Sequence, residues 1–155
     1  MVNDSLRVKT IVVGVDGSDH AAAAMAWAVS MARGMGSQIV AVYGVAPTIY
    51  VDAMSLGSMP PPEYDPEWRA AILKELDEDW TKPAREAGVA CRTVMRDGRP
   101  ATVISEVADE AKADVVVVGR RGRGGVGELL LGSVSHEVVL HTRRPVLVVS
   151  EPPSA

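Results

Sequence analysis

Short apolar runs alternate with longer stretches of helical periodicity along the chain, and this alternation restricts the fold more than any other feature. The run 115–118 consists of four valines, which is typical of a strand buried on both faces of a sheet. The other predicted strands are 10–15, 38–45, 89–95 and 145–150. Five strands alternating with helices predict a parallel, doubly wound α/β sheet.

Helix signals fill the segments between these strands. Ser18 can cap the first helix, which should end at Gly34 and Gly36, and Asp65 followed by a proline can cap the second. We expect Pro83 to kink the second helix before Gly88 ends it. The predicted helices are 19–35, 66–88, about 100–111 and about 133–141.

The chain length favours a single domain. It has 155 residues, of which 47% are hydrophobic, close to the usual domain size with ample material for a core. We expect one domain over 1–155 with an ordered core over about 8–150. The segment 46–64 is too long for an ordinary connection and is rich in Pro, Met and Gly, so we expect a functional or mobile loop there.

Charge and hydropathy argue against several classes of protein. The net charge is -4, whereas a nucleic-acid-binding domain is normally basic. No apolar run approaches the roughly 20 residues that a membrane span needs, and the N-terminus lacks the pattern of a signal peptide. Cys91 is the only cysteine, so neither an intramolecular disulfide nor a cysteine cluster can form. We expect a cytoplasmic protein without a membrane or nucleic-acid partner.

A glycine-rich basic stretch, 119–133, follows the fourth strand and opens the last helix. Such a loop can direct backbone N–H groups and a helix N-terminus at an anion, so phosphate is the first ligand to consider. It is not a standard P-loop, because Ser133 stands where the lysine belongs. The glycines at 122, 124 and 127 match a dinucleotide fingerprint, but they follow the wrong strand and lack the later acidic residue.

A third pattern fits in full: Gly119, two residues, Gly122, nine residues, Gly132 and Ser133. Together with VGVDGS at 13–18 and PVLVV at 145–149, it resembles the nucleotide-binding branch of the universal stress protein family. The resemblance covers nearly the whole chain and is weakest over 46–64. It implies strand order 3-2-1-4-5 in a Rossmann-like, adenine nucleotide alpha hydrolase-like fold. It also implies ATP or a close adenine nucleotide as ligand, with Mg²⁺.

The resemblance implies roles for individual residues. Asp16 would lie by the nucleotide, and Gly44 and Val45 would meet the adenine through their backbone. Asp16 could bind a ribose hydroxyl or a phosphate-held metal, or it could cap the first helix. The candidate nucleotide-binding residues are Gly14, Val15, Asp16, Ser18, Gly44, Val45, Gly119, Arg120, Gly122, Gly132, Ser133, Val134 and Ser135, with Asp16 also the candidate Mg²⁺ ligand.

Physical reasons support the loop residues in this set. Glycines can approach a ligand closely or adopt positive φ. Ser133 can donate its hydroxyl at the start of the last helix or simply cap that helix. The arginines at 120, 121 and 123 can neutralise phosphate, although charges in glycine-rich loops are usually just solvated.

The last strand carries a separate signal. In the implied strand order, 146–149 would leave an apolar edge bare, and pairing with a second copy would cover it. The resemblance likewise implies a homodimer. We therefore predict a dimeric stress-response regulator that acts through a nucleotide-dependent change in the dimer or the 46–64 loop, on an unknown protein partner. Two alternatives stay open: a slow ATPase, for which no general base can be assigned, and a dimeric module that binds cyclic AMP or has lost its ligand.

Overall fold

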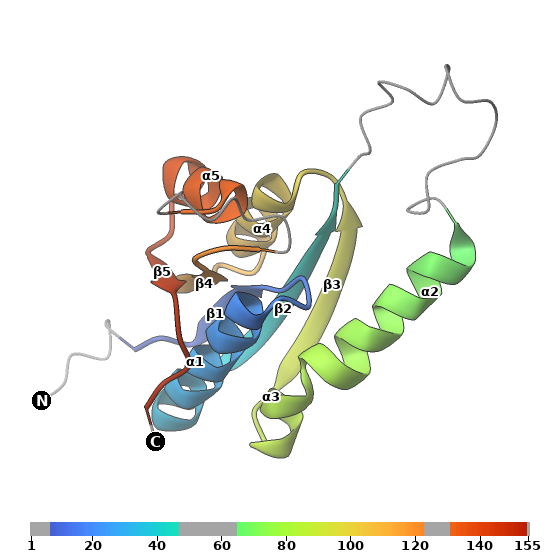
Figure 1. The fold of residues 1–155 in the computed structure, drawn as a ribbon. Helices are drawn as coiled ribbons and strands as arrows, with labels where there is room; N and C mark the ends of the chain where they lie inside the picture. The colour runs from blue at the N-terminus through green and yellow to red at the C-terminus, as the bar shows by residue number, and fades with distance from the viewer. Residues whose placement is uncertain (1–6, 47–64, 123–130, 155) are drawn as a thin grey trace, which may run out of the picture.

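The computed structural model describes residues 7–46, 65–122 and 131–154. It contains a five-stranded sheet in the order β3-β2-β1-β4-β5, with helices on both faces (Figure 1). All neighbouring strands are parallel. The strands are β1 (Thr10–Gly14), β2 (Gln38–Val45), β3 (Cys91–Asp97), β4 (Val115–Gly119) and β5 (Val146–Val149). The predicted fold class and strand order are confirmed.

The middle of the sheet is built from β-branched residues. Val12 pairs with Val40 on one side and with Val116 on the other, and all three are almost completely buried. Because helices cover both faces, these strands need no polar alternation, which explains their continuous apolar sequences. The core consequently lies in two layers, one on each face of the sheet.

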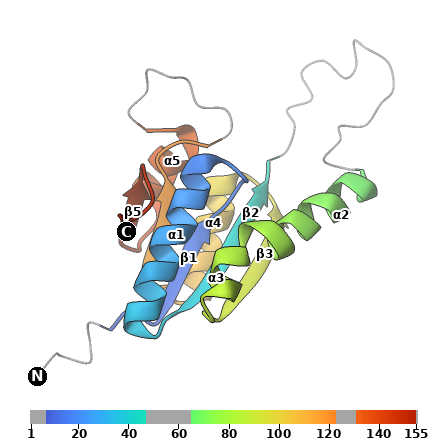
Figure 2. The same cartoon turned by 60° about the horizontal axis from the view of Figure 1, so that its bottom comes forward.

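Helix α1 (Asp19–Met35) covers one face of the sheet, with α3 (Lys82–Glu86) packed beside it (Figure 2). Its buried face is rich in alanine, which lets the helix approach the strands closely. Ser18 caps the helix, because its Oγ accepts the Ala21 N–H at 3.2 Å. Gly36 ends the helix in the left-handed region, with φ of 69°. Both ends of α1 therefore match the prediction.

The second predicted helix is not continuous. It consists of α2 (Pro66–Glu75), one π-helical turn, η3 (Leu76–Trp80), and the short α3. The break comes at Thr81, whose buried hydroxyl lies 3.0 Å from the carbonyl oxygens of both Leu76 and Asp77. Pro83 occupies the first turn of α3, where a backbone N–H is not needed. The predicted interruption near Pro83 is therefore found, but it begins upstream of the proline, at the π-helical turn and Thr81.

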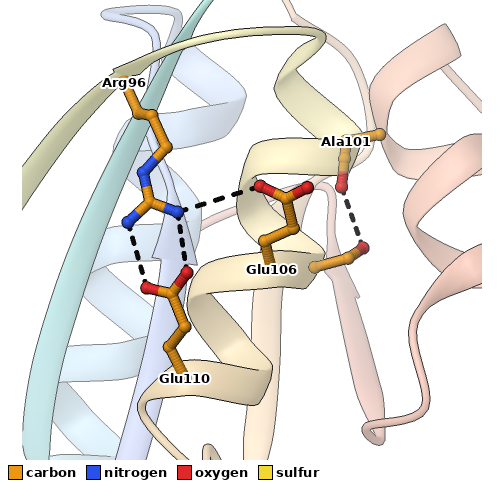
Figure 3. A network of polar contacts seen from close by, with 5 residues as sticks. Arg96, Ala101, Glu106 and Glu110 are labelled. Carbon is orange, nitrogen blue, oxygen red and sulfur yellow. Dashed lines mark hydrogen bonds and ion pairs between the residues drawn. The ribbon is translucent and has the colours of Figure 1, made fainter.

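The opposite face carries α4 (Pro100–Glu110) and α5 (Ser133–His141). Arg96, on the edge strand β3, holds this layer to the sheet by a forked contact with Glu110, with N···O distances of 2.9 and 3.0 Å (Figure 3). Its guanidinium also lies 3.8 Å from Glu106. Strand β3 begins two residues later than predicted and ends at Asp97 rather than near Met95.

Two predictions fall largely outside the described residues. The loop predicted at 46–64 is described only at Ala46, and Arg123 is not described. Among the helices that the structure describes, none combines the length and apolar character that crossing a bilayer requires.

Candidate functional site

A cleft lies at the carboxyl ends of β1 and β4, where the chain order across the sheet reverses. Doubly wound sheets bind their ligands at this position. The cleft holds about 480 Å³ of empty space, including space open to solvent. Its walls are formed by Gly14, Val15, Asp16, Ala21, Val42, Tyr43, Gly44, Pro100, Ile104, Val118, Gly119, Arg121, Gly122 and Val134.

The structure brings part of the predicted set together in this cleft: Gly14, Val15, Asp16, Gly44, Gly119, Gly122 and Val134. Ser133 instead lines a neighbouring hollow between the starts of α4 and α5, which shares Pro100 and Val134 with the cleft. Ser18 lines a crevice on the other side of the β1–α1 turn. The predicted residues that line neither the cleft nor these hollows are Val45, Arg120, Gly132 and Ser135.

Asp16 sits in the turn between β1 and α1. Its Oδ1 accepts the backbone N–H of Ser18 at 2.9 Å, whereas the cap of α1 is Ser18 itself. The option that Asp16 caps the helix is therefore wrong, and its contact is a local turn of the kind Asp commonly makes. The Oδ2 of Asp16 lies close to Gly122, which brings the β1–α1 turn against the segment after β4.

The glycines of the motif serve close backbone packing. Gly119, Gly122 and Gly132 do not have positive φ, so positive φ, one of the two reasons expected for them, is wrong. A Cβ on Gly119 would lie 2.6 Å from the carbonyl carbon of His20, and one on Gly132 would lie 3.1 Å from the Cα of Arg121. Because Gly119 has no side chain, the start of α1 can pack against the end of β4. Because Gly132 has none, the residues before and after 123–130 can come into contact.

Backbone and hydroxyl contacts join these two flanks. The Gly132 N–H donates to the carbonyl of Arg120 at 2.8 Å. The hydroxyl of Ser135 lies 2.9 Å from the same carbonyl oxygen and 3.0 Å from that of Gly132. The Nε of Arg120 is buried and has no hydrogen-bond partner in the described part of the chain. The Ser135 side chain therefore joins the two flanks of the site without lining the cleft.

The start of α5 is suited to an anion. Its cap is Gly132, in extended conformation and without a side-chain cap. The first backbone bond within the helix is donated by His136 to the carbonyl of Gly132 at 3.0 Å. The N–H groups of Ser133, Val134 and Ser135 precede it and have no acceptor within the helix. Together with the helix dipole, such groups form an anion-binding position.

Much of the cleft wall is apolar. Val42, Val118, Pro100 and Ile104 contribute to it from both sheet and helix. Gly44 lies so close to α4 that a Cβ there would meet the Cα of Pro100 at 2.6 Å. The sequence prediction missed these apolar residues because nothing distinguishes them from ordinary core positions. Proline at the first turn of a helix that follows a strand is the one signal that could have indicated Pro100.

Val45, which was predicted together with Gly44, does not line the cleft. It is buried, and its carbonyl accepts the N–H of Gly98 at 2.9 Å. Gly44 is thus the part of this pair that lines the cleft.

The residues present suit a metal ion only if the ligand brings it. Within 7–46, 65–122 and 131–154, no three His, Cys, Asp or Glu side chains gather as a metal site would require. Among the described residues that line the cleft, Asp16 is the single carboxylate. Mg²⁺ is commonly bound through one or two carboxylates together with substrate phosphates and water, so Asp16 fits Mg²⁺ carried by a nucleotide.

Cys91 lies away from the cleft, on β3. It is half-buried, and desolvation raises the pKa of its thiol above the ordinary value. The thiol therefore stays protonated at neutral pH and is a poor nucleophile.

Comparison with known proteins agrees with this geometry. The model of the universal stress protein family matches residues 7–150. The chain belongs to the universal stress protein family. A universal stress protein of Methanocaldococcus jannaschii is 35% identical over 148 residues, covering 93% of this chain and 83% of the relative. One from Thermus aquaticus is 35% identical over 149 residues, covering 91% and 98% respectively.

Solved structures of the family share the fold. The crystal structure of a universal stress protein in complex with cAMP has a TM-score of 0.69 and 26% identity, covering 93% of this chain and 98% of that one. The universal stress protein from Archaeoglobus fulgidus in complex with dAMP has a TM-score of 0.68 and 23% identity, covering 93% and 99%.

Proposed function

We propose that this universal stress protein is a regulator that binds ATP, or a closely related adenine nucleotide, in the cleft at the ends of β1 and β4. The observation that carries the proposal is the meeting, at the switch point of the sheet, of an apolar wall, one carboxylate and a helix start without a side-chain cap. Each of the three fits a different part of a nucleotide.

The apolar wall fits the base. Val42, Ile104 and Val118 offer flat aliphatic contact beside Gly44, and the missing side chain of Gly44 leaves room for the close approach of α4. Apolar surface with a few backbone polar groups is the usual composition of such pockets. The solved relatives with cAMP and dAMP hold adenine compounds, which supports adenine as the base.

The sugar and phosphates would lie between Asp16 and the start of α5. Asp16 would bring a carboxylate to a ribose hydroxyl or to Mg²⁺ from the turn in which its Oδ1 accepts the N–H of Ser18. The first-turn N–H groups of α5 and the backbone of 119–122 would donate to phosphate oxygens. Mg²⁺, when it arrives with the nucleotide, would neutralise part of the phosphate charge.

The proposal includes a homodimer in the cytoplasm that signals to a protein partner. Among the strands that the structure describes, β5 pairs with β4 alone and forms one edge of the sheet. Beside it, α5 exposes Val139 and Leu140, with 47% and 63% of their surface accessible. An apolar edge strand next to exposed apolar side chains favours pairing with a second copy.

Isothermal titration of the purified protein tests the nucleotide site. ATP, ADP, AMP, cyclic AMP, adenosine and GTP are titrated with and without Mg²⁺, after mass spectrometry has identified any molecule that copurifies. We expect ATP with Mg²⁺ to bind more tightly than GTP and adenosine. Tighter binding of cyclic AMP would make the cyclic nucleotide the ligand, and no heat with any adenine compound would overturn the proposal. Phosphate release that disappears in Asp16→Ala would instead make the protein an ATPase.

A further inference from the structure

The backbone of Arg120 forms a junction between three elements. Its N–H donates to the carbonyl of Val149, at the end of β5, at 2.7 Å. Its carbonyl accepts the N–H of Gly132 at 2.8 Å and lies 2.9 Å from the hydroxyl of Ser135. One peptide segment therefore links the end of β4, the end of β5 and the start of α5.

Among the described residues, Ser135 contributes its side chain to this junction, and it is 2% exposed. Its oxygen lies 3.0 Å from the carbonyl oxygen of Gly132 as well as 2.9 Å from that of Arg120. One hydroxyl proton is thus shared between the carbonyls that stand at the two ends of 120–132. Because Ser135 does not line the cleft, its hydroxyl can affect a ligand only through these backbone groups.

We propose that Ser135 is a positioning residue of the nucleotide site. Its hydroxyl helps to fix the separation between the 120–122 backbone and the first turn of α5, and the N–H groups of Gly122 and of that first turn would hold the phosphates. The inference rests on the proposed nucleotide function and deepens it. It names a residue outside the cleft wall that would set the positions of the phosphate-binding N–H groups. Ser133, whose side chain is exposed, remains the candidate for direct contact through its hydroxyl.

The junction allows a clean test, because removal of the hydroxyl leaves each carbonyl with another donor. Arg120 keeps the N–H of Gly132, and Gly132 keeps the N–H of His136. Ser135→Ala therefore creates no buried carbonyl without a donor, which is the costly outcome of deleting a hydrogen bond. The fold should survive while the two flanks lose one of the contacts that join them, the other being the Gly132 N–H bond to Arg120.

The first measurement compares ligands with and without phosphate. In Ser135→Ala we expect affinity for ATP with Mg²⁺ to fall about ten-fold, the equivalent of one ordinary hydrogen bond, and affinity for adenosine to stay within about two-fold. Ser105→Ala is the matched control, since the Ser105 hydroxyl also donates to a helix carbonyl, that of Ala101 at 2.8 Å, on α4. Equal losses for ATP and adenosine, or no loss for ATP, would overturn the positioning role.

The second measurement needs no nucleotide. Hydrogen exchange followed by NMR should show about ten-fold faster exchange of the Gly132 amide in Ser135→Ala. The reason is that its acceptor, the carbonyl of Arg120, loses the contact with the Ser135 hydroxyl. The Val15 amide, which donates to Val42 at 3.0 Å within the sheet, should be unchanged. Unchanged exchange at Gly132 would overturn the inference. Failure of the wild-type protein to bind any adenine compound would overturn the proposed function instead, so the two failures can be told apart.

Discussion

Gly122 packs against Asp16 so closely that a Cβ at position 122 would stand 2.7 Å from Asp16 Oδ2. The carboxylate cannot move away freely, because its Oδ1 holds the N–H of Ser18. We therefore expect Gly122→Ala to displace Asp16 or the 120–122 backbone and to weaken ATP binding on the order of ten-fold, the loss of about one hydrogen bond. Calorimetric titration measures the change. Unaltered affinity would show that this contact does not shape the site.

Asp16 offers a second test, which separates its two proposed roles. Asp16→Asn keeps an oxygen that can accept the Ser18 N–H but removes the charge. We expect the variant to bind ATP with Mg²⁺ about ten-fold more weakly, and to lose the Mg²⁺ dependence of the wild-type affinity because the metal loses its carboxylate ligand. Titrations with Mg²⁺ and with EDTA provide the comparison. If EDTA weakens both proteins equally, Asp16 contacts the ribose rather than a metal.

The sequence allowed the sheet and most helix ends to be predicted because these depend on local signals. Ser18 and Gly36 limit α1 as expected, and the valine run of β4 indicated a strand buried on both faces. The π-helical turn at Leu76–Trp80 was missed. It depends on where the Thr81 hydroxyl finds carbonyl acceptors, and periodicity does not contain that information.

At the candidate site, the sequence predicted where several residues lie but not why those residue types are needed there. Two of the motif glycines, Gly119 and Gly122, do line the cleft, but Gly119 is needed for contact with the backbone of His20, which is distant in sequence. Ile104 and Pro100 were missed because the cleft uses their apolar surface, which looks the same in sequence as core. Contacts between segments far apart in the chain therefore decide the part that was not predicted.

Two glycines at the end of α1 should respond in opposite ways to alanine. Gly34 lies within the helix with no atom near its absent Cβ, so Gly34→Ala should stabilise the protein by about 0.5–1 kcal/mol. Gly36 has φ of 69° at the helix end, so Gly36→Ala should destabilise it by about 1 kcal/mol or more. Urea unfolding with an unchanged slope measures both. Equal signs for the two variants would contradict this explanation.

The contact of Arg96 with Glu110 predicts a pH effect at the β3 edge (Figure 3). The hydrogen bond and charge of Arg96 lower the pKa of Glu110 below its ordinary value. Because the folded-state pKa is the lower one, the contact stabilises the fold above the unfolded-state pKa. That contribution is lost as pH falls through the folded-state pKa. NMR titration should show the Glu110 pKa rising toward its ordinary value in Arg96→Met, whereas an unchanged pKa would contradict the cause given.

The outer edge of β5 provides the test of the homodimer. Val149 and Pro145 direct their carbonyls at β4, where they accept the N–H groups of Arg120 and Val116. Since strand residues alternate in direction, Val146 and Val148 direct their backbone groups away from the sheet. Val148→Pro therefore removes an outward N–H without breaking the ladder to β4, as proline is tolerated at sheet edges.

We expect Val148→Pro to sediment as a monomer under conditions in which the wild-type protein sediments as a dimer, because the variant cannot complete pairing with a second copy. Val148→Ala is the matched control, since it shortens the side chain but keeps the N–H, and it should stay dimeric. ATP affinity measured in parallel shows whether the edge and the cleft are independent, as the two lie on different sides of β4. A Val148→Pro variant that remains a folded dimer would exclude pairing through this edge.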